Sequence, residues 1–273
     1  MSLHRVVEQR SLLEENRVLE VTPAFLEQTI LNFKSAGYRF ASMDELQWQV
    51  EKRKRNRRKF VCFTLDDGFA DNFEQAYPVF KKNNCPFTIY ITTDYPDKKA
   101  GYWWYQLEEL LIKKDNLLIN EVEYDCSDIE KKNISFVEIR NRIFSSAAET
   151  TMTELEQLFK DNNCHTKVHA LSWEQIVELS LDPLCTIGAH SVTHSSLPVL
   201  SDEEIRKELS ESKTIIEDRI KKPVKHFAYP YGNWDERVKE LVMKQYSTAV
   251  TTRWGDVKKR DHLFMLNRKT LVE

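Results

Sequence analysis

The fold is decided by the stretch Thr64-Leu65-Asp66-Asp67-Gly68-Phe69-Ala70-Asp71, which joins two segments of different hydrophobic periodicity. The apolar residues before it predict a buried strand over 60–65, and the amphipathic pattern after it predicts a helix over 71–83. Taken alone, the stretch is most simply a strand-to-helix turn in which one Asp caps the helix. In open sheets and in barrels, however, the loops at the carboxyl ends of the strands carry the catalytic residues. The paired carboxylates are therefore candidates for an active site.

Two histidines further along the chain favour the active-site interpretation. The segment His190-Ser191-Val192-Thr193-His194 follows directly after a strand predicted over 184–189. If this segment is helical, the two imidazoles lie on one face and can chelate one metal ion. In the first stretch, Gly68 can relax the backbone so that both carboxylates reach one pocket. One Asp and two His give three protein ligands with open positions, which is typical of a catalytic metal site.

The bulk composition is that of an ordinary globular protein. The 273 residues are 41% hydrophobic and 30% charged, and the formal net charge of −3 gives no bias towards nucleic acid. No apolar run approaches the length of about eighteen residues that a transmembrane helix needs. The densest charge run, residues 51–59, has no interleaved aromatic residues and predicts a solvated loop.

The cysteines and the first residues bear on the compartment. No two of the cysteines form a Cys-x-x-Cys pair, and three lie in or beside apolar runs, which favours reduced thiols in a reducing compartment. They are Cys62, Cys85, Cys126, Cys164 and Cys185. Residues 1–5 lack the apolar segment of a signal peptide. We therefore expect a cytoplasmic protein, and we leave open whether a natural start with a sorting signal precedes this sequence.

Strands and helices alternate along the chain. A strand predicted over 86–92 follows the helix over 71–83, and this order implies a right-handed parallel crossover. Residues 115–165 are charged, with a hairpin-like piece and two amphipathic helices, which predicts an insertion on the scaffold. We therefore expect residues 1–273 to form a single α/β domain with a helical insertion. The aromatic helix start at 102–105 fits core packing and a sugar-stacking platform equally well.

Three motifs of the chain resemble those of the polysaccharide deacetylases, carbohydrate esterase family 4, also called the NodB-homology family. Thr64-Leu65-Asp66-Asp67-Gly68 is similar to the first motif, T-F-D-D-G, and His190-Ser191-Val192-Thr193-His194 is similar to the second, H-S-x-T-H. Phe227-Ala228-Tyr229-Pro230-Tyr231-Gly232 resembles the third, R-x-P-Y-G. The motifs follow one another in the family's order, and the resemblance covers roughly residues 60–255.

The resemblance implies a distorted (β/α) barrel with about seven parallel strands and a metal-dependent deacetylase site. Asp67, His190 and His194 would be the metal ligands, with Zn²⁺ as the usual metal. Asp66 would be the general base that takes a proton from the attacking water. The backbone N–H of Tyr231 would help the metal to stabilise the tetrahedral oxyanion.

The resemblance also suggests residues around the substrate and leaves some roles open. The turn Pro230-Tyr231-Gly232 and Trp254 are candidates for substrate binding. Many relatives have an Arg beside the catalytic base where this chain has Ala228, so that charge is missing or comes from elsewhere. The general acid for the amine leaving group has no clear counterpart, and the candidates are His262 and His4. Arg268 resembles part of a late Leu-Pro-Arg stretch, with an open role.

The motifs and the resemblance together predict a metal-dependent hydrolase that removes N-acetyl groups from an N-acetylated sugar of a polysaccharide or glycan precursor. One alternative is a related amidohydrolase acting on a small non-peptide C–N bond. Another is a catalytically silent glycan-binding protein, although the presence of both carboxylates and both histidines argues against it. The sequence leaves the sugar, the preferred metal and the oligomeric state open. Similar proteins are often extracytoplasmic, which weakens the expectation of a cytoplasmic location.

Overall fold

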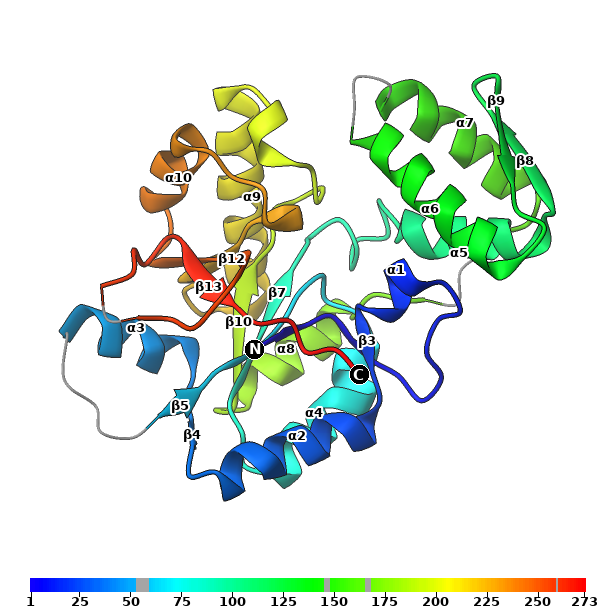
Figure 1. Ribbon diagram of the computed structural model, residues 1–273. Coiled ribbons are helices and arrows are strands. Elements are labelled where there is room, and N and C mark those ends of the chain that lie inside the picture. Colours follow the sequence, from blue (N-terminus) through cyan, green and yellow to red (C-terminus); the bar gives the residue numbers. More distant parts are fainter. Residues whose placement is uncertain (53–58, 145–147, 165–167, 259) are drawn as a thin grey trace. The chain divides into compact units, whose positions relative to one another are not determined.

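The computed structural model of the protein describes residues 1–52, 59–144, 148–164, 168–258 and 260–273 (Figure 1). The chain divides into two compact units. Unit 1 comprises residues 1–8, 21–100 and 170–273, and unit 2 comprises residues 9–20 and 101–169. Residues 53–58, which make up most of the predicted solvated loop, lie outside the described residues.

Unit 1 is built on a parallel sheet of seven described strands, with each hydrogen-bonded neighbour running in the same direction. In spatial order the strands are β1 (Ser2–Leu3), β6 (Phe63–Leu65), β7 (Phe87–Ile91), β10 (Cys185–Ala189), β11 (His226–Ala228), β12 (Thr248–Trp254) and β13 (Leu266–Arg268). All carboxyl ends therefore meet at one edge, as the sequence predicted. The strand predicted over 60–65 divides at Cys62: β5 (Phe60–Val61) pairs instead with β4 (Arg39–Phe40).

The first and last strands meet and bring the sheet close to a closed barrel. Ser2 pairs with Thr270 in a parallel bridge. The N–H of Ser2 donates to the carbonyl of Lys269 at 2.9 Å, and the N–H of Leu271 donates to the carbonyl of Ser2 at 2.8 Å. In Figure 1 the two termini accordingly lie side by side. The distorted seven-stranded (β/α) barrel expected from the sequence is confirmed.

Helices of unit 1 alternate with the strands and bury their apolar faces on the sheet. They are α2 (Pro23–Ser35), α3 (Met43–Lys52), the π-helical turn η1 (Asn72–Ala76) with α4 (Tyr77–Lys82), α8 (Trp173–Leu181), η2 (Leu197–Val199), α9 (Asp202–Ile220), η3 (Pro230–Gly232) and α10 (Glu236–Met243). The strands of the main core are apolar along most of their length because both faces of a parallel sheet are covered. Within that core Phe80 of α4 stacks on Phe87 of β7 with ring centroids 4.5 Å apart.

Side-chain caps set the starts of several of these helices. Thr22 accepts a hydrogen bond from the N–H of Phe25, with Pro23 as the first helical residue. Ser172 begins α8 with a capping box, and Ser201 does the same for α9. These caps satisfy backbone N–H groups in the first turns of the three helices and so define where each helix begins.

Unit 2 has its own small core. Its elements are α1 (Glu14–Arg17), α5 (Trp103–Lys113), the antiparallel hairpin of β8 (Asn116–Ile119) and β9 (Val122–Asp125), α6 (Ile129–Ile143) and α7 (Ala148–Asp161). It is larger than the insertion predicted over 115–165. Tyr102, Trp104 and Tyr105 are buried in it, which favours core packing over a sugar platform for this aromatic group. The carboxylate of Glu108 accepts from the N–H groups of Leu12 and Leu13 at the start of α1.

The short strands β2 (Arg5–Val6) and β3 (Glu20–Val21) complete the elements. Within the described residues, every helix is too short or too polar to cross a membrane. The prediction of a single domain stays a prediction.

Candidate metal centre and active site

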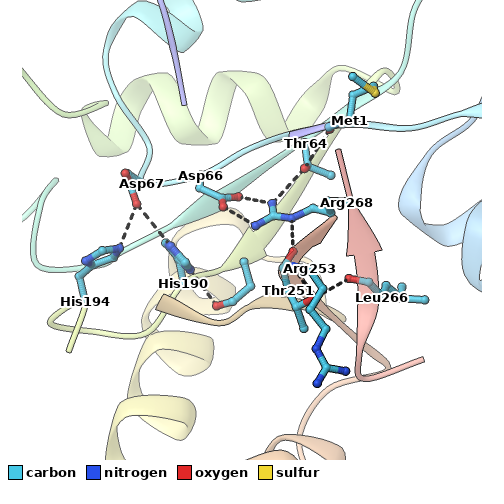
Figure 2. A network of polar contacts seen from close by, with 11 residues as sticks. Met1, Thr64, Asp66, Asp67, His190, His194, Thr251, Arg253, Leu266 and Arg268 are labelled. Carbon is cyan, nitrogen blue, oxygen red and sulfur yellow. Dashed lines mark hydrogen bonds and ion pairs between the residues drawn. The ribbon is translucent and has the colours of Figure 1, made fainter. Parts of the chain in front are cut away.

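The turn after β6 sends its two carboxylates in different directions. Asp67 and Gly68 both adopt left-handed backbone conformations, with φ of 73° and 69°. In a regular strand, successive side chains point to opposite faces of the sheet. The two positive φ angles end the strand here, so the direction of Asp67 is set by the turn. Figure 2 shows the result: Asp66 faces Arg268, whereas Asp67 faces the two histidines. From the sequence, only Gly68 was expected to adopt an unusual backbone conformation, but Asp67, which is not a glycine, has a left-handed backbone as well.

Asp67, His190 and His194 form a buried cluster. Oδ1 of Asp67 lies 3.3 Å from Nε2 of His190 and 3.1 Å from Nε2 of His194 (Figure 2). The ligand atoms of the three side chains all lie within 4.8 Å of one another, and the side chains are almost inaccessible to solvent. This convergence is the one that the sequence predicted.

The segment that carries the histidines is a loop, so the condition under which the sequence placed both imidazoles on one helix face is not met. No helix is assigned over residues 190–196, and Ser191 and His194 have left-handed φ angles of 65° and 63°. The Oγ of Ser191 accepts a hydrogen bond from the N–H of His194 at 3.0 Å, which folds the loop back on itself. The two imidazoles therefore converge because the loop is tightly turned.

The donor set of the cluster fits a divalent cation. Nδ1 of His190 lies 2.7 Å from the carbonyl of Ala228, so Nδ1 carries a proton and Nε2, which faces Asp67, is the nitrogen that would bind a metal. One carboxylate oxygen with two imidazole nitrogens is a ligand set of catalytic zinc sites and of other transition-metal sites. Asp67, His190 and His194 would hold the ion.

The pKa values of all three side chains in the cluster are shifted from their usual values. Burial raises the pKa of Asp67, but His194 and the hydrogen bonds from both histidines more than offset this and hold that pKa well below its usual value. Burial lowers the pKa of His194, which favours the neutral imidazole that a metal requires. Burial also lowers the pKa of His190, but the hydrogen bond with Asp67 and the negative charges of Asp66 and Asp67 together outweigh burial and raise that pKa overall. A metal ion would therefore have to displace a proton from His190.

Asp66 is paired with Arg268, which supplies the positive charge that Ala228 does not. The guanidinium donates to both carboxylate oxygens of Asp66, at 2.7 and 2.6 Å. It also donates to Oγ1 of Thr64 at 3.1 Å and to the carbonyl of Thr251 at 2.9 Å (Figure 2). Burial raises the pKa of Asp66, but the charge and hydrogen bonds of Arg268 more than offset it and lower that pKa overall. Asp66 is therefore an anion at neutral pH.

The Pro230-Tyr231-Gly232 turn lies beside the metal cluster. The ring of Tyr231 meets the ring of His194 edge-on, with centroids 4.4 Å apart. Tyr231 itself has a left-handed backbone, with φ of 57°. Gly232 is required by space as well as by its φ of 70°, because a Cβ there would lie 2.0 Å from Oγ1 of Thr252. The turn is thus held at the edge of the site by β12.

The remaining candidates occupy different surroundings. His4 follows β1, whose Leu3 pairs with Leu65 of β6, so it leaves the sheet beside Asp66. Its Nδ1 is buried with no hydrogen-bond partner in the described part of the chain. His262 is exposed, and its Nδ1 accepts from the N–H of Phe264. Trp254, at the end of β12, is 77% exposed, with Nζ of Lys269 4.9 Å from its ring centroid.

The chain belongs to the polysaccharide deacetylase family, whose sequence profile matches residues 53–250. This is an enzyme family of hydrolases that act on non-peptide C–N bonds, and it is metal-dependent. A relative from Bacillus subtilis (strain 168), which carries the provisional name polysaccharide deacetylase YxkH, is 21% identical over 233 residues. The match covers 85% of this chain and 58% of that protein, so the chain spans little more than half the length of this relative.

Solved structures share the fold. The Streptococcus pyogenes deacetylase PplD, in complex with acetate, superposes with a TM-score of 0.69 at 18% identity, over 100% of this chain and 91% of that one. IcaB from Ammonifex degensii has a TM-score of 0.65 at 17% identity, over 99% and 90%. A de-N-acetylase from Aggregatibacter actinomycetemcomitans has a TM-score of 0.65 at 14% identity, over 100% and 94%.

Proposed function

We propose that the protein is a metal-dependent N-deacetylase that acts on an N-acetylated sugar of a polysaccharide or glycan precursor. The observation that carries this proposal is the pair of adjacent carboxylates with separate partners. Asp67 faces two imidazoles, and Asp66 is held by Arg268. One acid is thereby available as a ligand and the other as a base.

Zn²⁺ is the metal that we propose for the site, because its preferred ligands include imidazole nitrogen and carboxylate oxygen. A cation held by Asp67, His190 and His194 supplies Lewis acidity that makes water a nucleophile near neutral pH. Three protein ligands leave room for the substrate at the same centre.

The protein side chains divide the proton transfers between them. Asp66, anionic because of Arg268, accepts the proton of the attacking water. The N–H of Tyr231 stabilises the oxyanion that forms from the acetamide carbonyl. His4 follows β1, which neighbours β6 on the side away from β7, and it donates a proton to the amine leaving group. Pro230 and Gly232 shape the turn for the substrate, and Trp254 offers an exposed ring at the strand end.

The test is acetate release from a panel of N-acetylated oligosaccharides, with a small ureide and an imide alongside, using metal-stripped and metal-restored protein. We expect acetate release from the sugars that metal removal abolishes and metal return restores. Asp66→Asn should reduce turnover by at least about 100-fold while metal content stays near stoichiometric.

The adjacent substitution Asp67→Asn is the matched control, because it should remove the metal together with the activity. If Asp66→Asn retains its activity, or if it loses the metal as Asp67→Asn does, the division of roles is wrong. Turnover of the ureide or imide without acetate release from any sugar would favour an amidohydrolase over the proposed deacetylase. Binding of glycans without acetate release would indicate a catalytically silent binding protein.

A further inference from the structure

The loop that carries both histidine ligands is in a conformation that its own sequence does not favour. Ser191 and His194 are held at φ angles of 65° and 63°, although neither is a glycine. A non-glycine residue in this region costs on the order of 1–3 kcal/mol and persists where surrounding contacts impose it. The contact between Ser191 Oγ and the N–H of His194 lies within the loop and moves with it. Contacts from another element are needed to fix the loop in place.

Glu208, on the helix α9, provides such contacts. One oxygen of its carboxylate accepts from the N–H of Val192 at 2.8 Å and from the N–H of Thr193 at 3.0 Å. The other oxygen accepts from Oγ1 of Thr193 at 2.9 Å. Glu208 is only 9% exposed, and in the described part of the chain it forms no ion pair. All three of these bonds therefore tie α9 to the two residues midway between the histidines.

Charge-assisted hydrogen bonds of this kind are stronger than neutral ones, and they act at both backbone N–H groups between the left-handed residues. The neutral imidazoles must approach Asp67 from two directions, and their separation depends on the shape of the loop between them. On its other side the loop is held by the N–H groups of Thr93 and Asp94, which donate to the carbonyls of Ser191 and Val192 at 3.3 and 3.0 Å. Loss of the Glu208 contacts would therefore loosen the loop and shift the imidazoles relative to Asp67 without releasing the loop completely.

We infer that Glu208 is a positioning residue of the metal centre, which holds the loop so that His190 and His194 present their Nε2 atoms to one cation. The inference rests on the proposed function in that it takes the Asp67–His190–His194 cluster as a metal site. The hydrogen bonds of the Glu208 carboxylate go to Val192 and Thr193, which lie between the two histidines, so Glu208 acts on the loop between the proposed ligands.

The experiment compares Glu208→Gln with Glu211→Gln, an exposed position on the same helix that loses the same charge. Purified full-length proteins are titrated with Zn²⁺ against a competing chelator, and the Co²⁺-substituted forms are compared by their d–d absorption spectra. Loss of a group that orients a ligand typically weakens metal binding by about 10–100-fold. We expect a loss of that size, with an altered Co²⁺ spectrum, for Glu208→Gln and little change for Glu211→Gln.

Thr193→Val is the second variant, because it removes one of the three bonds without changing the charge or the side-chain volume much. We expect it to weaken metal binding in the same direction by a smaller factor and to fold even if Glu208→Gln does not. Metal affinity and Co²⁺ spectra equal to those of the unsubstituted protein in Thr193→Val and in a folded Glu208→Gln would overturn the inference and leave the proposed function standing. Absence of metal binding by the unsubstituted protein would overturn both.

Discussion

At the scale of single residues, the two candidates for the general acid, His4 and His262, have different surroundings in the structure. His4 leaves β1 beside Asp66, and its carbonyl accepts a hydrogen bond from the side chain of Asn72 at 2.8 Å. The segment is held further by Asp71, which accepts from the N–H of Val6 and from Nε of Arg5. His262 is exposed and contacts Phe264. A buried ring nitrogen on an anchored segment is better placed for a proton transfer than an exposed one.

We therefore predict that His4→Gln reduces kcat by about 100- to 10,000-fold, because the amine leaving group then lacks its proton donor. Metal content should stay unchanged. His262→Gln, the matched control, should release acetate at the rate of the unsubstituted protein. A large loss in His262→Gln with normal activity in His4→Gln would reverse the assignment.

At the same scale, the sequence indicated the ligands well and the supporting residues poorly. Asp67, His190 and His194 were recognisable because ligand atoms must be of particular residue types at particular spacings. Glu208 was not singled out, although an acid on the apolar stripe of α9 next to Leu209 is a signal that it has partners inside the protein. Its partners belong to a loop sixteen residues earlier, and no local pattern names them.

At the scale of elements, the active-site loops depend on residues with left-handed backbones. The Pro230-Tyr231-Gly232 turn is the most crowded of them, because a Cβ at Gly232 would meet the side chain of Thr252 through Oγ1, Cγ2 and Cβ. Thr252 cannot remove all three atoms by rotation. Gly37, with φ of 77°, has the same backbone requirement, but nothing lies within 4 Å of the position of its Cβ.

A comparison of Gly37 with Gly232 separates the effect of a left-handed backbone from the effect of steric crowding. We predict that Gly37→Ala lowers the free energy of unfolding by about 1–2 kcal/mol and leaves deacetylation unchanged. Gly232→Ala should lower it further and should also reduce kcat, because the turn must move and displace Tyr231 from His194. Chemical denaturation and acetate release measure the two effects. Equal stability losses with equal activity would show that the contact with Thr252 is unimportant.

The segment 190–194 shows why the conformation of an element is harder to predict than the residues that it carries. A spacing of four places two side chains on one face of a helix, and a tight loop can bring them together equally well. The loop form depends on Glu208 and on the hydroxyl of Ser191, and both are tertiary or turn contacts that hydrophobic periodicity does not register.

At the scale of the whole molecule, Asp66, the proposed general base, depends on the last strand for its partner. Arg268 and Asp66 are 202 residues apart, and they meet because β13 returns to β1 and nearly closes the barrel. Both side chains are 4% exposed. Removal of one partner of a buried pair leaves the other charge uncompensated, which typically costs about 3–5 kcal/mol.

We predict that Arg268→Met raises the pKa of Asp66, because burial then acts without the offsetting charge. The acid limb of the kcat–pH profile should move to higher pH, with Arg268→Lys in between. In the unsubstituted protein the stabilisation from Asp66 is present above its unfolded pKa and is lost as pH falls through the lowered folded pKa. In Arg268→Met the folded pKa is raised instead, so the stability difference between the two proteins should grow with rising pH.

Urea unfolding across a pH series measures this difference, and the activity profile is recorded on the same preparations. An acid limb that stays in place in a folded Arg268→Met protein would contradict the role of Arg268. An Arg268→Lys protein that keeps the acid limb in place and still loses stability would show that the positive charge, more than the bidentate geometry, sets the pKa of Asp66.

The sequence by itself determined the class of fold, the family and the identity of the residues that can bind a metal. All of these are encoded in short windows, namely the alternation of strands and helices and three motifs in a fixed order. The tertiary structure alone decided that Arg268 compensates for Ala228, that His4 lies beside the base and that Glu208 holds the histidine loop. Those contacts join segments that are separate in the sequence. Arg268 reaches Asp66 because the first and last strands meet, and His4 lies beside Asp66 because β1 pairs with β6. Glu208 reaches the histidine loop because α9 packs against the loop after β10. No window of sequence contains these pairings.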